Sequence, residues 1–172
     1  MNSNFQKQAG FTLIEMLIVI VVLVILAMII VPQVTDYSDD TTLRTLQTNL
    51  NTLRRAVEIY YIQHCKTYPG AHNINGNPAA NTGLAAKAFR QQLFRYSDIN
   101  GKTSLTKDAT YKFGPYLKAK ELPINPFNNK NDVKCDFTTT DITVKTSDGS
   151  TGWKFYTETG ILIANDGAHD DL

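Results

Sequence analysis

The chain opens with an apolar run and later changes to a helical alternation of apolar and polar residues. Every residue from Met16 to Val31 is apolar, and Pro32 follows the run. A helix over residues 11–31 would be about 31 Å long, enough to cross the hydrocarbon layer of a bilayer. Proline removes a backbone donor and crowds the preceding turn, so a kink is expected at Pro32. The run predicts a membrane-spanning helix over residues 11–34.

Beyond the proline the pattern becomes amphipathic. Apolar residues recur at steps of three and four and share one face of a helix from about Asp36 to Lys66: Leu43, Leu46, Leu50, Leu53, Val57 and Tyr60. We expect this face to pack on a sheet of the same chain. A coiled coil with a partner is the less favoured alternative, because the flanking positions lack ordered charge pairs.

The middle of the chain predicts a loop, a short helix and a connector. A loop rich in Asn, Gly and Pro ends before Leu84, and the spacing then predicts a helix over residues 84–96. Its inward side chains are expected to be Leu84, Ala88, Phe89 and Leu93. The three prolines over residues 115–126 forbid regular structure, so this stretch predicts an extended connector with aromatic anchors.

The last third of the chain predicts a three-stranded antiparallel meander. Its strands are expected at residues 141–146, 153–157 and 161–164, with turns between them. The apolar face, which includes Ile142, Val144, Trp153 and Phe155, should meet the long helix. The expected fold class is therefore α+β: a long N-terminal helix, with a transmembrane half kinked near Pro32 and then an amphipathic half, packed on a small C-terminal antiparallel β-sheet.

The edge of the apolar run carries an acid. Glu15 lies close to the start of the predicted span, where an ionisable group next to hydrocarbon is costly unless it is paired or reaches the headgroups. The heptapeptide GFTLIEM, from Gly10 to Met16, resembles the processing site of the type IV filament superfamily, which includes type IV pilins and the pseudopilins of type II secretion.

The resemblance implies a maturation pathway. A prepilin peptidase would cut after Gly10 and methylate the new N-terminus at Phe11. Residues 1–10 would then be a leader, residues 11–34 a transmembrane and filament-core helix, and residues 35–172 a globular head that includes the amphipathic half of the long helix. A cut before the apolar helix leaves that helix in the product.

The new amine suggests a role for Glu15. A carboxylate at the rim of an apolar helix is stabilised by a cation in the same low-dielectric layer. Within one chain, the Glu15 carboxylate meets the Phe11 amine only loosely. A neighbouring helix that is shifted along the axis can present its own Phe11 amine instead. We therefore expect Glu15 to set the register of adjacent subunits by pairing with the neighbour's Phe11 amine, and both Glu15 and Pro32 to serve assembly.

A second, looser resemblance concerns the connector. The stretches GPYLK at 114–118 and LPINPFN at 122–128 are similar to the Gly-Tyr-Leu and Leu-Pro-x-Asp-Pro-Trp-Gly stretches of the major pseudopilins. Asn125, Phe127 and Asn128 depart from that pattern. The resemblance implies a structural subunit, first the major pseudopilin of a type II secretion system, with a type IV pilus major pilin or a minor pilin or tip adhesin as alternatives.

The resemblance also implies partners and a location. The partners are further copies in a helical homopolymer, the prepilin peptidase, an assembly platform protein and ATPase, and minor pilins or pseudopilins. The chain would first cross the inner membrane once, with a periplasmic head, and later join a periplasmic or cell-surface filament. Lys7 and the initiator amine are the only positive charges before the helix, and they favour a cytoplasmic N-terminus.

Composition adds exclusions and two candidate sites. With 17 basic and 16 acidic residues in 172, nothing indicates a nucleic-acid partner. No constellation typical of an active site occurs, so no enzyme activity and no required cofactor are expected. Cys65 and Cys135 form either one disulfide in an exported head or two small buried thiols.

The acidic residues near the end of the sequence are a candidate calcium site. They are Asp166, Asp170 and Asp171, and their hard oxygens suit that ion. Major pseudopilins, which the chain resembles, bind calcium in a C-terminal acidic loop. The alternative is a solvated, charged end of the chain.

Overall fold

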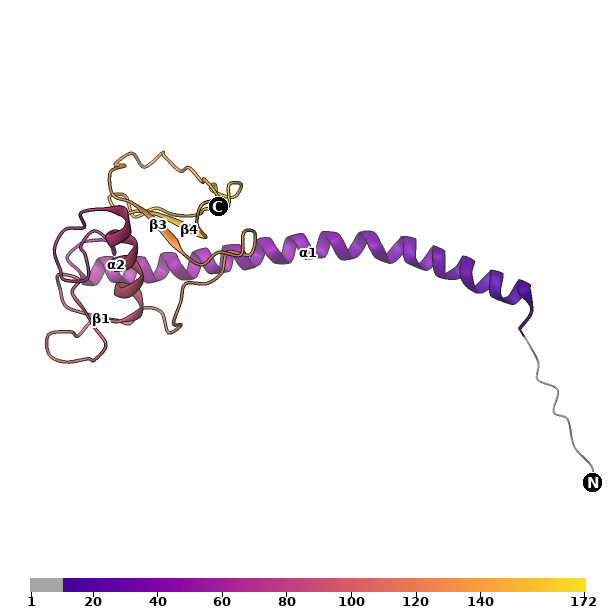
Figure 1. Ribbon diagram of the computed structural model, residues 1–172, viewed down its shortest axis with the longest axis horizontal. Helices are drawn as coiled ribbons and strands as arrows, with labels where there is room; N and C mark the ends of the chain where they lie inside the picture. Colours follow the sequence, from indigo (N-terminus) through magenta and orange to yellow (C-terminus); the bar gives the residue numbers. More distant parts are fainter. Residues whose placement is uncertain (1–10) are drawn as a thin grey trace, which may run out of the picture. The chain divides into compact units, whose positions relative to one another are not determined.

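The computed structural model describes residues 11–172, except for the side chains of residues 29–39. The chain divides into two compact units, one ending at Thr41 and one from Thr42 to Leu172. The first contains the N-terminal part of a long helix. The second, which we call the head, contains the end of that helix, a second helix and two small sheets (Figure 1).

The long helix α1 runs from Leu13 to Gln63. It ends where the backbone turns into the left-handed region, with φ of 52° at Cys65 and 62° at Lys66. The Lys66 N–H donates to the Tyr61 carbonyl at 3.0 Å, which satisfies one of the last carbonyls of the helix. The predicted end at Lys66 was thus three residues too late. Pro32 lies among the residues whose side chains are outside the description, and its kink stays a prediction.

Helix α2 runs from Thr82 to Phe94 and begins at a side-chain cap. The Asn81 Oδ1 accepts a hydrogen bond from the Leu84 N–H at 2.9 Å, as expected of an N-cap asparagine. Ala88, Phe89 and Leu93 are buried, as the spacing predicted. The prediction for Leu84 was wrong, because this side chain is 37% exposed in the first turn.

The head contains a three-stranded mixed sheet in the order β3-β4-β5. Its strands are Val133–Asp136, Trp153–Tyr156 and Leu162–Ala164. Strands β3 and β4 are parallel, and β4 and β5 are antiparallel. A separate antiparallel pair joins β1, Tyr96–Ser97, to β2, Thr103–Ser104.

The predicted antiparallel meander was partly wrong. The strands around Trp153 and Leu162 are present, but the third strand is Val133–Asp136 and residues 141–146 are a loop. Ile142 is 68% exposed rather than inward. The loop instead bonds to the outer side chains of β4: the Lys154 Nζ donates to the Thr146 carbonyl at 2.8 Å. Both faces of β4 are therefore buried.

One apolar core holds the head together. It joins the predicted face of α1 to α2 and to the sheet, which lie beside the C-terminal end of α1 (Figure 1). Leu46, Leu50, Leu53, Val57 and Tyr60 are all at most 1% exposed, which confirms the amphipathic face and its packing on a sheet of the same chain. Leu43, at the edge of this face, is half-buried.

The proline-rich connector packs on the core without forming a helix or strand, as predicted. Leu122 is 2% exposed, and the Trp153 indole N–H donates to the Pro123 carbonyl at 2.8 Å. Asn125 is fully buried; its Nδ2 donates to the Gly152 carbonyl at 3.0 Å and its Oδ1 accepts from the Phe127 N–H at 3.0 Å. The connector thus joins the start of the central strand β4 to the core.

Candidate functional site

The start of α1 is closed by a reciprocal pair of side chains. Thr12 precedes the first helical residue, and its Oγ1 accepts a hydrogen bond from the Glu15 N–H at 3.3 Å. The Glu15 Oε2 in turn accepts from the Thr12 N–H at 2.8 Å and from the Thr12 hydroxyl at 2.7 Å. This is a capping box, which satisfies backbone donors that a helix start leaves unpaired.

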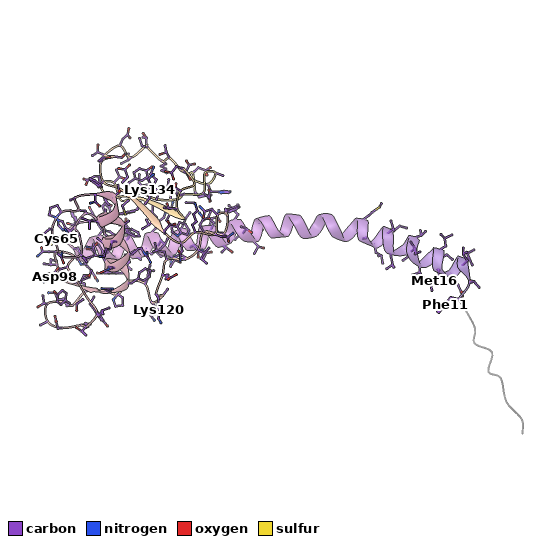
Figure 2. The ribbon with its side chains drawn as sticks, in the orientation of Figure 1. Phe11, Met16, Cys65, Asp98, Lys120 and Lys134 are labelled. Carbon is purple, nitrogen blue, oxygen red and sulfur yellow. The ribbon has the colours of Figure 1, made fainter. Side chains whose placement is uncertain are left out.

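The capping box fixes the place of the Glu15 carboxylate. A negative charge in the first turn also suits the positive end of the helix dipole. Phe11 is 79% exposed, and with Glu15 and Met16 it lines a hollow of about 500 Å³ at the helix start. Figure 2 shows Phe11 and Met16 at this end of α1. Phe11 and Glu15 therefore lie on the same small surface.

The described turns that follow expose apolar side chains on every side of the helix. From Met16 to Leu26, each large apolar side chain is 48–59% exposed. Consecutive residues in a helix point about 100° apart, so equal exposure along the run means that no face of it is covered by the residues that the structure describes. Such a surface needs lipid or other protein chains as its surroundings.

The sequence around this surface matches a known family model. Residues 5–31 match the model of the prokaryotic N-terminal methylation motif. The chain carries the prokaryotic N-terminal methylation motif. This motif is the signature of type IV pilins and pseudopilins, and it confirms the resemblance seen from Gly10 to Met16. No curated protein and no solved structure matches the chain.

Three of the predicted site residues, Gly10, Phe11 and Glu15, lie within the matched stretch. Phe11 and Glu15 lie together at the helix start, as described above. Gly10, the predicted cleavage position, lies outside the described residues, as does the side chain of Pro32. Among the residues that the structure describes, no helix is both long and apolar enough to cross a membrane. The predicted span, residues 11–34, includes residues 29–34, whose side chains are not described.

Thr12 was missed by the sequence reasoning, although a signal for it was present. A Thr or Ser followed three residues later by Glu, directly before an apolar run, is typical of a capping box. The four residues Thr12 to Glu15 have this pattern. The position of Glu15 was interpreted only through its charge, so its bond to the helix start was overlooked.

The two cysteines are both free thiols in the structure, so the disulfide considered between them is not formed there. Cys65 is exposed just after the end of α1, and Cys135 is buried in β3. Burial raises the pKa of the Cys135 thiol well above its ordinary value. Cys135 therefore behaves as a small apolar core residue.

The acidic residues near the end of the sequence are bonded separately. Asp166 accepts hydrogen bonds from the Ala168 and His169 N–H groups, and Asp170 accepts one from the Ser147 N–H at 3.1 Å. Asp171 is exposed and lines a hollow near Arg54. Within residues 11–172 as described, no group of three or more His, Cys, Asp or Glu side chains is placed to hold a metal ion.

A buried Ser–His pair lies at the end of α1. The His64 Nε2 is 3.0 Å from the Ser97 Oγ, and its Nδ1 is 2.9 Å from the Tyr60 carbonyl. His64 is 1% exposed and Ser97 is fully buried. Burial lowers the pKa of His64, which favours the neutral ring. The pair joins α1 to β1, and its burial gives a substrate no direct approach to the Ser97 hydroxyl.

Proposed function

We propose that this protein is the structural subunit of a type IV pilus-like filament, and specifically the major pseudopilin of a type II secretion system. The N-terminal methylation motif carries the proposal, because it marks type IV pilin-like subunits. The uncovered apolar surface of α1 and the separate, well-packed head support it. The first suits lipid or a filament core, and the second suits a surface exposed to water.

Maturation begins at the membrane in this proposal. Residues 11–34 span the inner membrane, with the head in the periplasm, until the prepilin peptidase cuts after Gly10 and methylates Phe11. An assembly platform protein and its ATPase then move the subunit into a filament, with minor pilins or pseudopilins as further partners. The apolar side chains exchange lipid contacts for contacts with other copies of the helix.

The Glu15 carboxylate provides the register between copies in this proposal. In the single chain Oε2 is held by Thr12, which keeps the charge fixed at the rim of the apolar surface. The amine created at Phe11 of a neighbouring copy supplies the opposite charge. In a water-poor filament core an unpaired carboxylate is strongly disfavoured, so pairing selects one axial offset between helices.

Two substitutions at Glu15 separate charge pairing from helix capping. Glu15→Gln keeps an oxygen that accepts from Thr12 but loses the charge, whereas Glu15→Leu loses both. If pairing sets the register, both variants lose filaments, as counted by electron microscopy of sheared cells and by the polymer fraction. Normal filaments from Glu15→Gln, with none from Glu15→Leu, would instead assign the role to the cap.

Two controls accompany the Glu15 experiment. Mass spectrometry of the wild-type product should find Phe11 as a methylated N-terminus, and a product that lacks residues 1–31 would overturn the proposal. Thermal unfolding of each full-length variant in detergent should match the wild type, because Glu15 lies outside the head.

A surface type IV pilus is the second candidate. The connector departs from the major pseudopilin pattern at Asn125, Phe127 and Asn128, which favours considering a major pilin, or a minor pilin or tip adhesin. Microscopy of the filament at native expression separates these functions. A periplasmic filament supports the pseudopilin, and filaments on the cell surface support the pilin.

A further inference from the structure

The loop before β4 presents its oxygen atoms to lysines of the same chain. It comprises residues 146–151, and we call it the 146–151 loop. The Lys154 Nζ, on β4, donates hydrogen bonds to the Thr146 carbonyl at 2.8 Å and to the Thr146 Oγ1 at 3.0 Å. Lys154 is only 8% exposed, and its Nζ lies 4.9 Å from the centre of the Tyr156 ring. A buried ammonium group needs oxygen partners, and the loop supplies them.

Two further lysines bond the other end of the loop. The Lys130 Nζ donates to the Gly149 carbonyl at 2.8 Å and to the Ser150 carbonyl at 3.1 Å. The Lys134 Nζ, on β3, forms an ion pair with the Asp148 carboxylate. We call Lys130, Lys134 and Lys154 the lysine cluster. Its ammonium groups come from separate places in the chain and bond oxygens of one loop.

Both oxygens of the Asp148 carboxylate already accept hydrogen bonds. Oδ2 accepts from Lys134, and Oδ1 accepts from the Ser150 N–H at 3.0 Å, the Ser150 hydroxyl at 2.6 Å and the Asn165 Nδ2 at 2.8 Å. The bond from Lys134, with these further bonds, lowers the pKa of Asp148 well below its ordinary value. Asp148 is therefore ionised in the head at neutral pH, and a lysine of the same chain neutralises its charge.

The stretch in which the resemblance implied calcium lies against the same loop. Asp170 accepts a hydrogen bond from the Ser147 N–H, and the Gly167 N–H donates to the Ser147 hydroxyl at 2.6 Å. The Asn165 Oδ1 accepts from the Asp148 N–H at 2.8 Å, and Asn165 is fully buried. The 146–151 loop and the acidic residues near the end of the sequence therefore form one bonded unit.

These oxygens do not fit a calcium ion as the structure arranges them. Calcium takes about six to eight oxygen ligands at about 2.3–2.6 Å, with carboxylates prominent among them. The carboxylates of Asp148, Asp166 and Asp170 accept hydrogen bonds from N–H groups of the head. An ion at these oxygens would also lie near the ammonium groups of the lysine cluster, which repel it. The calcium implied by the resemblance therefore conflicts with the cations that the chain itself places at this loop.

We propose that the lysine cluster holds the 146–151 loop on the head and that the head needs no calcium ion there. An ammonium group supplies a positive charge and several hydrogen-bond donors, which fix carbonyls and a carboxylate without a metal. Because the lysines are part of the chain, the loop stays ordered at any calcium concentration. The inference concerns the head of a single subunit and goes beyond the proposed filament.

Hydrogen exchange of the wild-type protein with and without calcium is the first test. Full-length protein in detergent is measured in calcium chloride, in magnesium chloride as the ionic control, and in the chelator EGTA. Exchange of peptides that cover the 146–151 loop should be the same in all three solutions, because the loop oxygens are already bonded. Slower exchange of the loop in calcium alone would overturn the proposal.

A pair of lysine substitutions tests whether the lysine cluster holds the loop. Lys130→Met with Lys134→Met removes two ammonium groups at exposed positions and keeps long side chains. In EGTA the loop of this double variant should exchange at least about fivefold faster, because partly exposed charged bonds are lost. Equal exchange in the double variant and the wild type would refute a role for the lysines.

Lys145→Met is the matched control. Lys145 is an exposed lysine directly before the loop, and within the described residues it bonds none of the loop oxygens. Its removal changes the net charge next to the loop and should leave loop exchange as in the wild type. Faster exchange in this variant, equal to that of the double variant, would assign the effect to net charge and overturn the proposal.

Exchange of α2 separates a local effect from misfolding. Peptides from α2 should stay as protected in the double variant as in the wild type, because the lysines lie outside that helix. Should this protection be lost, the single variants Lys130→Met and Lys134→Met decide: each should speed exchange of the loop while α2 stays protected, and no effect in either would overturn the proposal. Filament formation is scored separately, since its failure would refute the proposed function and leave this inference unchanged.

Discussion

Apolar side chains at the two ends of α1 differ in their exposure to solvent. Leu23, in the N-terminal part, is 59% exposed, and Leu53, in the head, is fully buried. Both residues are leucines of one continuous helix, so residue type and secondary structure do not explain the difference. The surroundings do: the head covers its part of the helix with α2 and the sheet, whereas the described residues leave the N-terminal part uncovered.

Sequence periodicity accounts for this contrast. Apolar residues in the head part recur at steps of three and four, so a single face is apolar and a single chain can cover it. The N-terminal run is apolar at every position, so its apolar surface surrounds the helix. The comparison teaches that one continuous helix can be covered by its own chain in one part and left uncovered by the described residues in the other.

The largest expected effect comes from a matched pair of leucine truncations. Leu53→Ala removes a fully buried side chain and should lower the free energy of unfolding of the head by about 2–5 kcal/mol, through lost burial and the cavity left behind. Leu23→Ala should change it by less than about 0.5 kcal/mol, because its side chain lies outside the head core. Urea unfolding of full-length protein in detergent, followed by the fluorescence of Trp153, measures both.

The same pair should have different effects on assembly. Leu23→Ala, in the uncovered part, should weaken polymerisation while the head stays folded. If Leu23→Ala destabilised the head as much as Leu53→Ala, the separation of the two parts of α1 would be wrong.

A smaller effect tests how the head buries polar groups. Asn125→Ala removes the bonds to Gly152 and Phe127 inside the head and should cost about 1–3 kcal/mol of unfolding free energy, because buried partners lose their hydrogen bonds. The control is Asn131→Ala, whose side chain bonds the exposed Glu121 and should cost less than about 0.5 kcal/mol. Equal losses in the two variants would show that the connector does not depend on Asn125.

The smallest effect concerns pH. Burial lowers the pKa of His64, so the unfolded chain takes up a proton at a higher pH than the folded head does. The contribution of the neutral His64 ring to the free energy of unfolding is fully present above the unfolded histidine pKa of about 6.5. It is lost as pH falls below that value, and the free energy of unfolding then changes by at most about 1.4 kcal/mol per pH unit. Unfolding of wild type and His64→Phe from pH 7.5 to 5 measures this slope.

His64→Phe removes the titrating group and retains an aromatic ring beside Tyr60, whose ring lies 3.7 Å from that of His64. Its stability should vary less with pH over this range than that of the wild type. Asp98 and Tyr116 are also near His64, so equal slopes in the two proteins would assign the pH dependence to other groups.

Local patterns predicted the helical elements well. The steps from Leu46 to Tyr60 identified the buried face of α1, and the spacing of Ala88, Phe89 and Leu93 identified that of α2. Residues on one face of a helix lie three or four positions apart in the sequence, so their spacing predicts which side chains share a face. The N-terminal motif was recognised for the same reason, and the capping box at Thr12 could have been read from four residues.

The sheet was harder because its partners are distant in sequence. Ile142 and Val144 alternate as a strand should, yet Val133 and Cys135 pair with β4 instead. Alternation of apolar and polar residues indicates that a segment tends to be extended, but it does not predict which strand the segment pairs with. The segment that pairs with β4 is the one that also supplies side chains to the core, and both Val133 and Cys135 do so.

The sequence by itself determined the two parts of α1, the acid at its start and the motif for processing, because each depends on residues within a few turns of one another. Only the tertiary structure decided which strand lies beside β4, that Ile142 is exposed, and that Lys130, Lys134 and Lys154 donate to oxygens of one loop. These features join segments far apart in the chain, and their free energy comes from packing and charge across those segments. No local pattern encodes such contacts.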